Sequence, residues 1–201
     1  MQDLQIETTI LLSNKDIYMS RQDDFLITSL RSSIKVDFSN ELSCLDFSNG
    51  VIKLEEVGHI SFYQLDLDFP QRNLAILADL ISQDLCYAAS FFLYGQGQRY
   101  LSDRYLFYVD EVFVQPKYRG LKYGIKALAI SLSGFALGET VCCHPYPIHD
   151  LRNKYSDKQG KRLIKRYWSK IGLENYAEPQ NILWAENWSM PEWLEERIFS
   201  E

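Results

Sequence analysis

The chain has 201 residues, 46% of them hydrophobic, which suffices for one sizeable core that buries roughly 70% of the unfolded surface. Its formal net charge of -6 disfavours general nucleic-acid binding, which depends on neutralising phosphates, and no apolar run reaches the roughly 18 residues of a membrane-spanning helix. We therefore expect no nucleic-acid partner and no membrane partner.

The first half of the chain contains several strand patterns and one long helical pattern. Residues 1–31 show no pattern that we can assign. We expect strands at 34–38, 43–47, 51–54 and 57–67, and a hairpin around Ser48-Asn49-Gly50, because Asn-Gly favours a tight turn. After Pro70 comes one helical run, followed by a turn at 95–98. Its apolar face comprises Leu74, Leu77, Ile81, Leu85, Ala88 and Phe92.

The second half alternates strands with helices. We expect strands at 105–114, 139–143 and 182–184, and helices at 121–137, 158–170 and 191–199. Antiparallel strands followed by strand–helix–strand–helix–strand predict an α/β (α+β) fold with a mixed sheet, and not a doubly wound dinucleotide fold.

The N-terminus and the cysteines bear on the cellular compartment. Residues 1–12 carry acidic side chains and no basic segment of the kind that begins a secretory signal peptide. Cys44, Cys86, Cys142 and Cys143 show no spacing typical of a disulfide framework. We expect reduced cysteines and a cytoplasmic protein.

The stretch Val112–Gly124 has the order of a phosphate-binding turn. An apolar strand stops at Pro116, a turn with Gly120 and Gly124 follows, and a helical pattern then begins. Backbone N–H groups converge at a helix start, where the dipole also favours an anion. We expect the helix to tolerate a larger side chain at Gly124, while a ligand there would not. Positive charge comes from Lys117, Arg119 and Lys122.

These residues resemble the acyl-CoA-binding motif of the GNAT superfamily of N-acetyltransferases. Val114-Gln115-Pro116, Tyr118-Arg119-Gly120 and Gly124 match the family pattern, whereas Lys122 stands where the family usually has a glycine. The resemblance implies acetyl-CoA as co-substrate, and we expect no metal. It implies that pantetheine is held by the backbone of Val112, Phe113 and Val114, and the pyrophosphate by Arg119, Gly120, Leu121, Lys122, Tyr123 and Gly124.

The resemblance also implies a GNAT-like fold, with a mixed, mostly antiparallel central sheet flanked by helices. A single domain over 1–201 would comprise an N-terminal elaboration at 1–56, a core at 57–184 and a C-terminal extension at 185–201. Further similarity, to a bacterial branch of the superfamily, comes from Ser82-Gln83-Asp84-Leu85, Pro145-Tyr146-Pro147 and Arg166-Tyr167-Trp168.

The segment that begins at Tyr167 resembles the end of the last helix in many GNAT enzymes. Many of them use a tyrosine there to protonate the departing CoA thiolate. Trp168 occupies that place here, and an indole N–H has no accessible proton to give. The adjacent Tyr167 points about 100° away around the helix.

Asp110 and Glu111 are the candidate catalytic residues, because a carboxylate near the middle of strand 105–114 would be a natural base. Neighbours on a strand point to opposite faces, so at most one should face the cleft directly. We expect Asp110 on the side of Val112 and Val114. The alternative for each carboxylate is a solvated edge residue.

Two further features have both a plain and a functional interpretation. His144 and His149 follow Cys142-Cys143, but the spacing fits no standard zinc site, and His144 is either an ordinary histidine or a proton carrier. The segment 152–170 has eight basic residues against one acidic residue, Asp157. Such a run is either a solvated helix face or a positive rim for a phosphate-rich cofactor or an acidic partner.

Three functions remain open on the sequence. The first is an acyl-CoA-dependent N-acyltransferase that transfers an acetyl group directly to an amine on a small molecule or peptide. The second is a non-catalytic GNAT-fold module that binds CoA or a protein partner. The third is an acidic interaction protein that binds no nucleotide.

Overall fold

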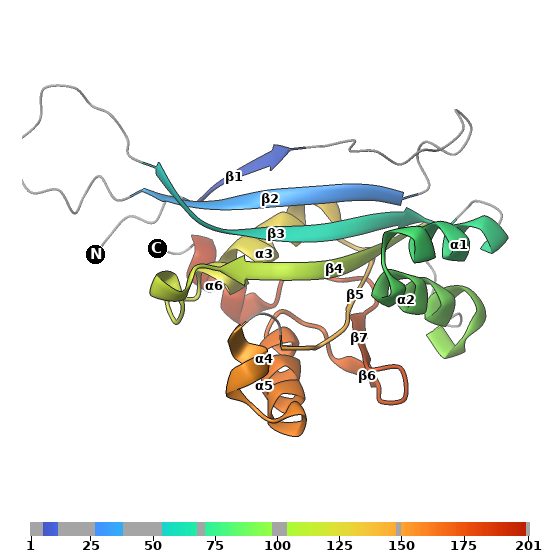
Figure 1. Cartoon of the computed structure of the whole chain (residues 1–201). Coiled ribbons are helices and arrows are strands. Elements are labelled where there is room, and N and C mark those ends of the chain that lie inside the picture. Colours follow the sequence, from blue (N-terminus) through green and yellow to red (C-terminus); the bar gives the residue numbers. More distant parts are fainter. Residues whose placement is uncertain are drawn as a thin grey trace, which may run out of the picture.

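The computed structural model describes residues 6–11, 27–37, 54–67, 71–97, 104–147 and 150–199. They contain one seven-stranded sheet with the order β1-β2-β3-β4-β5-β7-β6 (Figure 1). Neighbouring strands are antiparallel, except for the parallel pair β4 and β5. The strands are β1 (Ile6–Leu11), β2 (Ile27–Asp37), β3 (Leu54–Asp66), β4 (Tyr105–Val114), β5 (Thr140–Cys143), β6 (Asn175–Ala177) and β7 (Ile182–Ala185).

Helices flank the sheet, which confirms the expected mixed, mostly antiparallel fold class. They are α1 (Gln71–Ile81), α2 (Gln83–Tyr94), α3 (Tyr123–Phe135), α4 (Asp150–Lys154), α5 (Asp157–Ser169) and α6 (Glu192–Phe199), with a short 3-10 helix η3 (Pro116–Tyr118). None of the helices in the described part of the chain is long and apolar enough to cross a membrane.

The two faces of the sheet bury separate cores. On one face, Phe107 and Val109 of β4 pack with α3, α5 and α6; on the other, Leu106 and Tyr108 pack with α1 and α2. Figure 1 shows α1 and α2 in front of the sheet and α3 behind it. Cys142 and Cys143 point to opposite faces through the same alternation, and each belongs to a different core.

The prediction of a single helical run after Pro70 is wrong, because the chain forms two helices that meet at Ser82. Ser82 is extended (φ -159, ψ 149), and its Oγ accepts a hydrogen bond from the Leu85 N–H at 3.1 Å. This is the N-cap geometry that serine favours, and it satisfies a backbone donor that would otherwise lack a partner. The apolar periodicity continues across the break and therefore conceals it.

Strand β2 begins seven residues before the expected 34–38 and ends at Asp37. Its buried positions alternate as Leu30, Ser32, Ile34 and Val36, so a serine interrupts the apolar pattern. The Ser32 hydroxyl lies 3.2 Å from the Ser131 hydroxyl of α3, which satisfies both polar groups in the core. The hairpin around Ser48-Asn49-Gly50 lies outside the described residues.

Later elements agree better with the sequence pattern. The expected strand at 105–114 is confirmed, and α3, α5, β5, β7 and α6 lie within two residues of the expected ends. Two short elements, α4 and β6, were not expected, since five and three residues are too few for a periodic signal.

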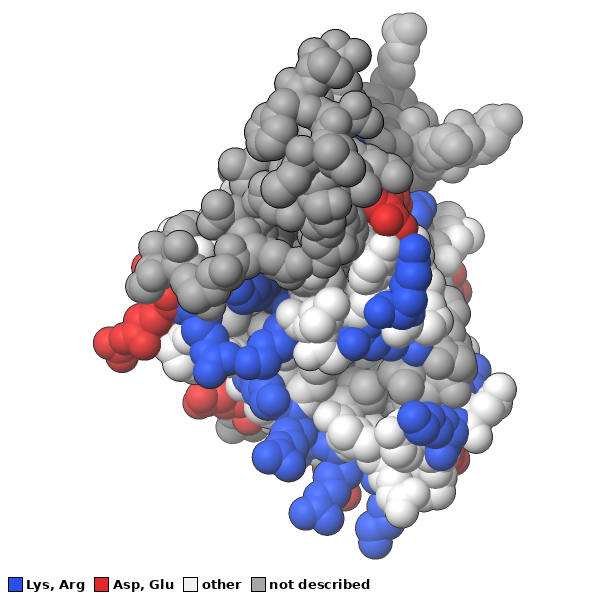
Figure 2. Space-filling model, turned by 90° about the vertical axis from the view of Figure 1, so that its left-hand side faces the viewer, with Lys and Arg blue, Asp and Glu red and all other residues white. Residues whose placement is uncertain are grey.

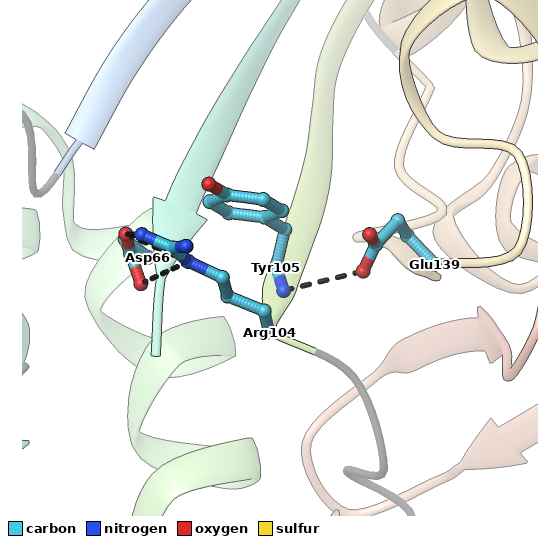
Figure 3. Close-up of polar contacts among 4 residues, drawn as sticks. All are labelled: Asp66, Arg104, Tyr105 and Glu139. Carbon is cyan, nitrogen blue, oxygen red and sulfur yellow. Dashed lines mark hydrogen bonds and ion pairs between the residues drawn. The ribbon is translucent and has the colours of Figure 1, made fainter. Parts of the chain in front are cut away.

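Polar contacts fasten the first residues of β4 to both neighbouring strands (Figure 3). The Arg104 guanidinium donates to the buried Asp66 carboxylate at the end of β3, at 2.8 Å for Nη2. The Tyr105 N–H donates to Glu139 Oε2, just before β5, at 3.2 Å. These bonds fix the register of β3, β4 and β5 at the end where β4 starts.

We expect Asp66→Ala to lower the free energy of unfolding by about 1–3 kcal/mol, because it removes the charged hydrogen bonds that join Arg104 to the buried Asp66 carboxylate. Thermal or urea unfolding measures the change. Asp79→Ala, at an exposed position of α1, is the matched control and should stay within about 0.5 kcal/mol. Equal effects of the two substitutions would contradict this role of Asp66.

Candidate active site

A cavity of about 630 Å³ lies where β4 and β5 separate. The two strands pair from Leu106↔Thr140 to Val109↔Cys143; β5 then ends, while β4 continues to Val114. Beyond Val109, this edge of β4 has no strand partner within the described residues. Backbone groups on a buried edge need hydrogen-bond partners, so the edge is suited to a ligand that supplies them.

A β-bulge at Asp110 sets the direction of the side chains along the cavity. Val109 is opposite Phe62 and Glu111 is opposite Ser61, so Asp110 has no opposite residue on β3. An extra residue in one strand shifts the alternation of faces by one.

The bulge overturns the expected orientation of the two carboxylates. Val112 and Val114 pack with the α3-side core, as Val109 does before the bulge, so Asp110 does not share their side. Asp110 and Glu111 both line the cavity, whereas simple alternation allowed only one to face it. The candidate site therefore brings both carboxylates together.

The cavity has a group of acidic side chains. Asp84, from the first turn of α2, lines the wall with Asp110 and Glu111. Burial raises the pKa of the Asp110 carboxyl, and repulsion from Glu111 and Asp84 raises it further. Glu111 has a close contact on β3, since its Oε2 lies 3.1 Å from His59 Nε2.

His144, the first residue after β5, also lines the cavity. Both of its ring nitrogens are buried, and neither has a hydrogen-bond partner among the described residues. Its ring lies nearly perpendicular to the Tyr108 ring, with 5.8 Å between the two centroids and 80° between the two planes. Burial lowers the pKa of His144, while Asp84 acts weakly in the opposite direction, so the imidazole is neutral at pH 7.

The turn after β4 supplies basic and glycine residues. Arg119 Nε donates to the Val114 carbonyl at 2.9 Å, which holds the guanidinium at the end of the strand. Gly120 has φ +87 and nothing within 4 Å of an added Cβ. Of the expected phosphate-binding residues, Leu121 is exposed and lies outside the lining, and those that line the cavity are Arg119, Gly120, Lys122, Tyr123 and Gly124.

Lys122 is the N-cap of α3 and adopts a left-handed conformation, φ 65 and ψ 11, without a side-chain cap bond. This backbone region favours glycine, because a Cβ there approaches the following carbonyl oxygen. The conformation gives a physical reason for the glycine that the resembling motif has at this position. Lys122 keeps the turn shape and adds an ammonium on an exposed side chain.

Gly124 is buried, and the expectation that the helix would tolerate a larger residue there is wrong. An added Cβ would lie 2.9 Å from Tyr167 Oη and 3.2 Å from methyl carbons of Val112 and Val114. A valine would therefore push β4 and α5 apart, so its effect on binding could not be separated from an effect on packing.

Tyr167 is the main residue that sequence reasoning set aside. It lines the cavity beside Trp168, and burial raises the pKa of its hydroxyl. Its Oη is close to the α3 start and has no hydrogen-bond partner within the described residues. Tyr167 follows Ile164 by three residues, which places both on one face of α5, and Ile164 also lines the cavity. This spacing was the signal available in the sequence. The lining also includes Tyr108 and Ile125, which the sequence did not indicate, and Asp84, Tyr118, Tyr146 and Arg152, which lie in segments that the sequence singled out without naming them as site residues.

The basic segment lies mainly outside the cavity. Arg152 of α4 lines it, whereas Lys158, Lys161 and Arg162 of α5 are exposed and are not part of the lining. Figure 2 shows a face of the molecule on which Lys and Arg side chains predominate over Asp and Glu. Among the described residues, no cluster of three or more His, Cys, Asp or Glu side chains could hold a metal ion. His149 lies outside them.

We expect Lys122→Gly to raise the free energy of unfolding by about 1 kcal/mol, because glycine removes the strain of the left-handed N-cap. Lys126→Gly is the matched control in the right-handed interior of the same helix, and it should lower stability by about 1 kcal/mol. Denaturant unfolding of both variants measures the difference. A loss of stability in Lys122→Gly would contradict the strain at this position.

Comparison with known proteins gives one remote structural similarity. A crystal structure of a mutant of KacT matches with a TM-score of 0.38 and 10% sequence identity, over 90% of this chain and 81% of that chain. No protein-family model matches the chain, and no curated protein matches it either. A similarity this weak carries no argument about fold or function.

Proposed function

We propose that the protein is a GNAT-type N-acetyltransferase that uses acetyl-CoA and transfers its acetyl group directly to an amine. The observation that carries this proposal is the separation of β4 from β5 at a cavity that ends in a basic, left-handed turn and a helix start. The strand edge offers backbone groups to an amide-containing chain, and the turn offers backbone amides and cations to phosphates.

The residues fit the two parts of the co-substrate. Val112, Phe113 and Val114 line the cavity on the open edge of β4 and would bind pantetheine through their backbone. The amides of residues 119–124 and the charges of Arg119 and Lys122 would bind the pyrophosphate. Gly120 leaves space for close approach, since nothing lies within 4 Å of its added Cβ.

Bound acetyl-CoA supplies the thioester, and the side chains of the cavity move the protons. The neutral amine nitrogen forms a bond to the carbonyl carbon as the carbon–sulfur bond breaks. One amine proton passes to the carboxylate of Glu111 or Asp110, and the leaving sulfur takes a proton from Tyr167 Oη. Exchange with solvent returns the proton from the carboxylate to the tyrosine, so the products are an amide and the CoA thiol.

Tyr167 is the proposed acid in place of Trp168. Its hydroxyl lies at the cavity wall without a partner in the described part of the chain, and the indole N–H of Trp168 is too weak an acid to protonate a thiolate. The Tyr167 hydroxyl keeps its proton at neutral pH, because burial raises its pKa. It is therefore available as a donor throughout the physiological range.

A non-catalytic CoA-binding module is the second candidate. The observation that favours it is the pair of departures from the family motif, Lys122 and Trp168, both in the cavity lining. Binding of acetyl-CoA without any release of CoA thiol in the presence of amines would select this candidate.

The first test is calorimetry of the full chain with acetyl-CoA and, in parallel, with acetylpantetheine, which lacks the phosphates. We expect acetyl-CoA to bind with a dissociation constant of about 1 mM or lower. Acetylpantetheine should bind at least about tenfold more weakly, because it cannot use the turn at 119–124. No heat with acetyl-CoA would refute the proposed function, and equal affinities would refute the phosphate site.

The second test is Tyr167→Phe, which removes the proposed acid and little else. We expect kcat to fall about 100-fold while KM for acetyl-CoA changes little, as measured by release of the CoA thiol. Tyr155→Phe, which lies outside the cavity lining, should keep full activity. Unchanged turnover in Tyr167→Phe would assign the acid to another group.

A further inference from the structure

The acidic side of the cavity has a negative charge that no described residue balances at Asp110 and Asp84. Asp110 and Asp84 of α2 both line the cavity with exposed carboxylates, and neither makes a hydrogen bond or ion pair to a described residue. Glu111 differs from both, because it contacts His59. Repulsion from Glu111 and Asp84 raises the pKa of Asp110, so a cation bound beside these side chains would be stabilised by them.

A second feature of the same wall is the imidazole of His144. Its two ring nitrogens are buried and lack partners in the described part of the chain, and one of them carries a lone pair in the neutral ring. Buried polar atoms without partners are rare in proteins, and a bound ligand is one of the established reasons for them. A cation that donates hydrogen bonds would satisfy the acceptor nitrogen of His144 and would also balance the carboxylates.

The chemistry of acetyl transfer decides how many charges such a ligand needs. The attacking amine must be neutral when its nitrogen reaches the thioester, so a monoamine balances no carboxylate at that moment. A second ammonium on the same molecule remains protonated throughout. It can keep Asp84 and Asp110 paired while Glu111 accepts the proton of the attacking amine.

We propose that the acceptor is a small diamine, whose second ammonium binds between Asp84, Asp110 and His144. This inference rests on the proposed acetyltransferase function and adds the class of acceptor. The proposed subsite for the second ammonium lies apart from the side of the cavity proposed for the cofactor, where the lining includes Arg119 and Lys122.

The test measures binding of 1,4-diaminobutane and of butylamine to the full chain by calorimetry, without acetyl-CoA. We expect the diamine to bind at least about tenfold more tightly, because its second ammonium forms charged hydrogen bonds. Asp110→Asn and Asp84→Asn should each remove most of this preference. Asp79→Asn, on the exposed surface of α1 and outside the cavity, is the matched control and should keep it.

A cooperative thermal unfolding transition will show whether each variant folds. Asp110→Asn should also melt at a higher temperature than the parent protein at pH 7, and not at pH 3. The folded-state pKa of Asp110 is raised, so its ionised form is penalised only above that pKa. With acetyl-CoA present, mass spectrometry should find the monoacetylated diamine.

Equal binding of the two amines, or an unchanged preference in both Asp110→Asn and Asp84→Asn, would overturn the diamine proposal. Neither result depends on acetyl-CoA. Failure of acetyl-CoA to bind would instead refute the proposed function, and a diamine preference measured without it would still establish the cationic subsite.

Discussion

The four-residue parallel pairing of β4 with β5 is the constraint on which the site depends. Parallel strands that paired along their whole length would leave no cavity, and strands that did not pair would leave the two sheet halves unconnected. The bonds from Arg104 to Asp66 and from Tyr105 to Glu139 fix the start of β4 to β3 and to the residue before β5. Separation at the other end follows from the early end of β5 at Cys143.

The bulge at Asp110 adds the second requirement, which is the direction of the side chains. Without it, Val112 and Val114 would exchange faces with Glu111 and Phe113, and the start of α3 would lose its apolar contact with β4. One extra residue therefore lets β4 serve the α3-side core and present two adjacent carboxylates to the cavity. Bulges near functional sites commonly redirect side chains in this manner.

Much of the second half of the fold was predictable from the sequence, because its elements have long periodic patterns with clear ends. Tyr105–Val114 is an example, bounded by Pro116 on its C-terminal side. The position of the turn between β4 and α3 was predictable for a similar reason, since glycines and basic residues mark it locally. The break at Ser82 and the inward Ser32 were not, because their polar groups are satisfied by contacts that a pattern of apolar residues does not reveal. The acidic wall depends on the bulge and on Asp84 of α2, which come together only in the folded chain.

The order in which Cys142 and Cys143 react can show which core of the protein opens first. They are adjacent in β5 and fully buried, and burial raises the pKa of both thiols, so neither reacts readily in the closed protein. Cys142 belongs to the core beneath α1 and α2, and Cys143 to the core beneath α3. Alkylation of one thiol before the other would thus report which layer of helices leaves the sheet first, within a single tryptic peptide and without any introduced label.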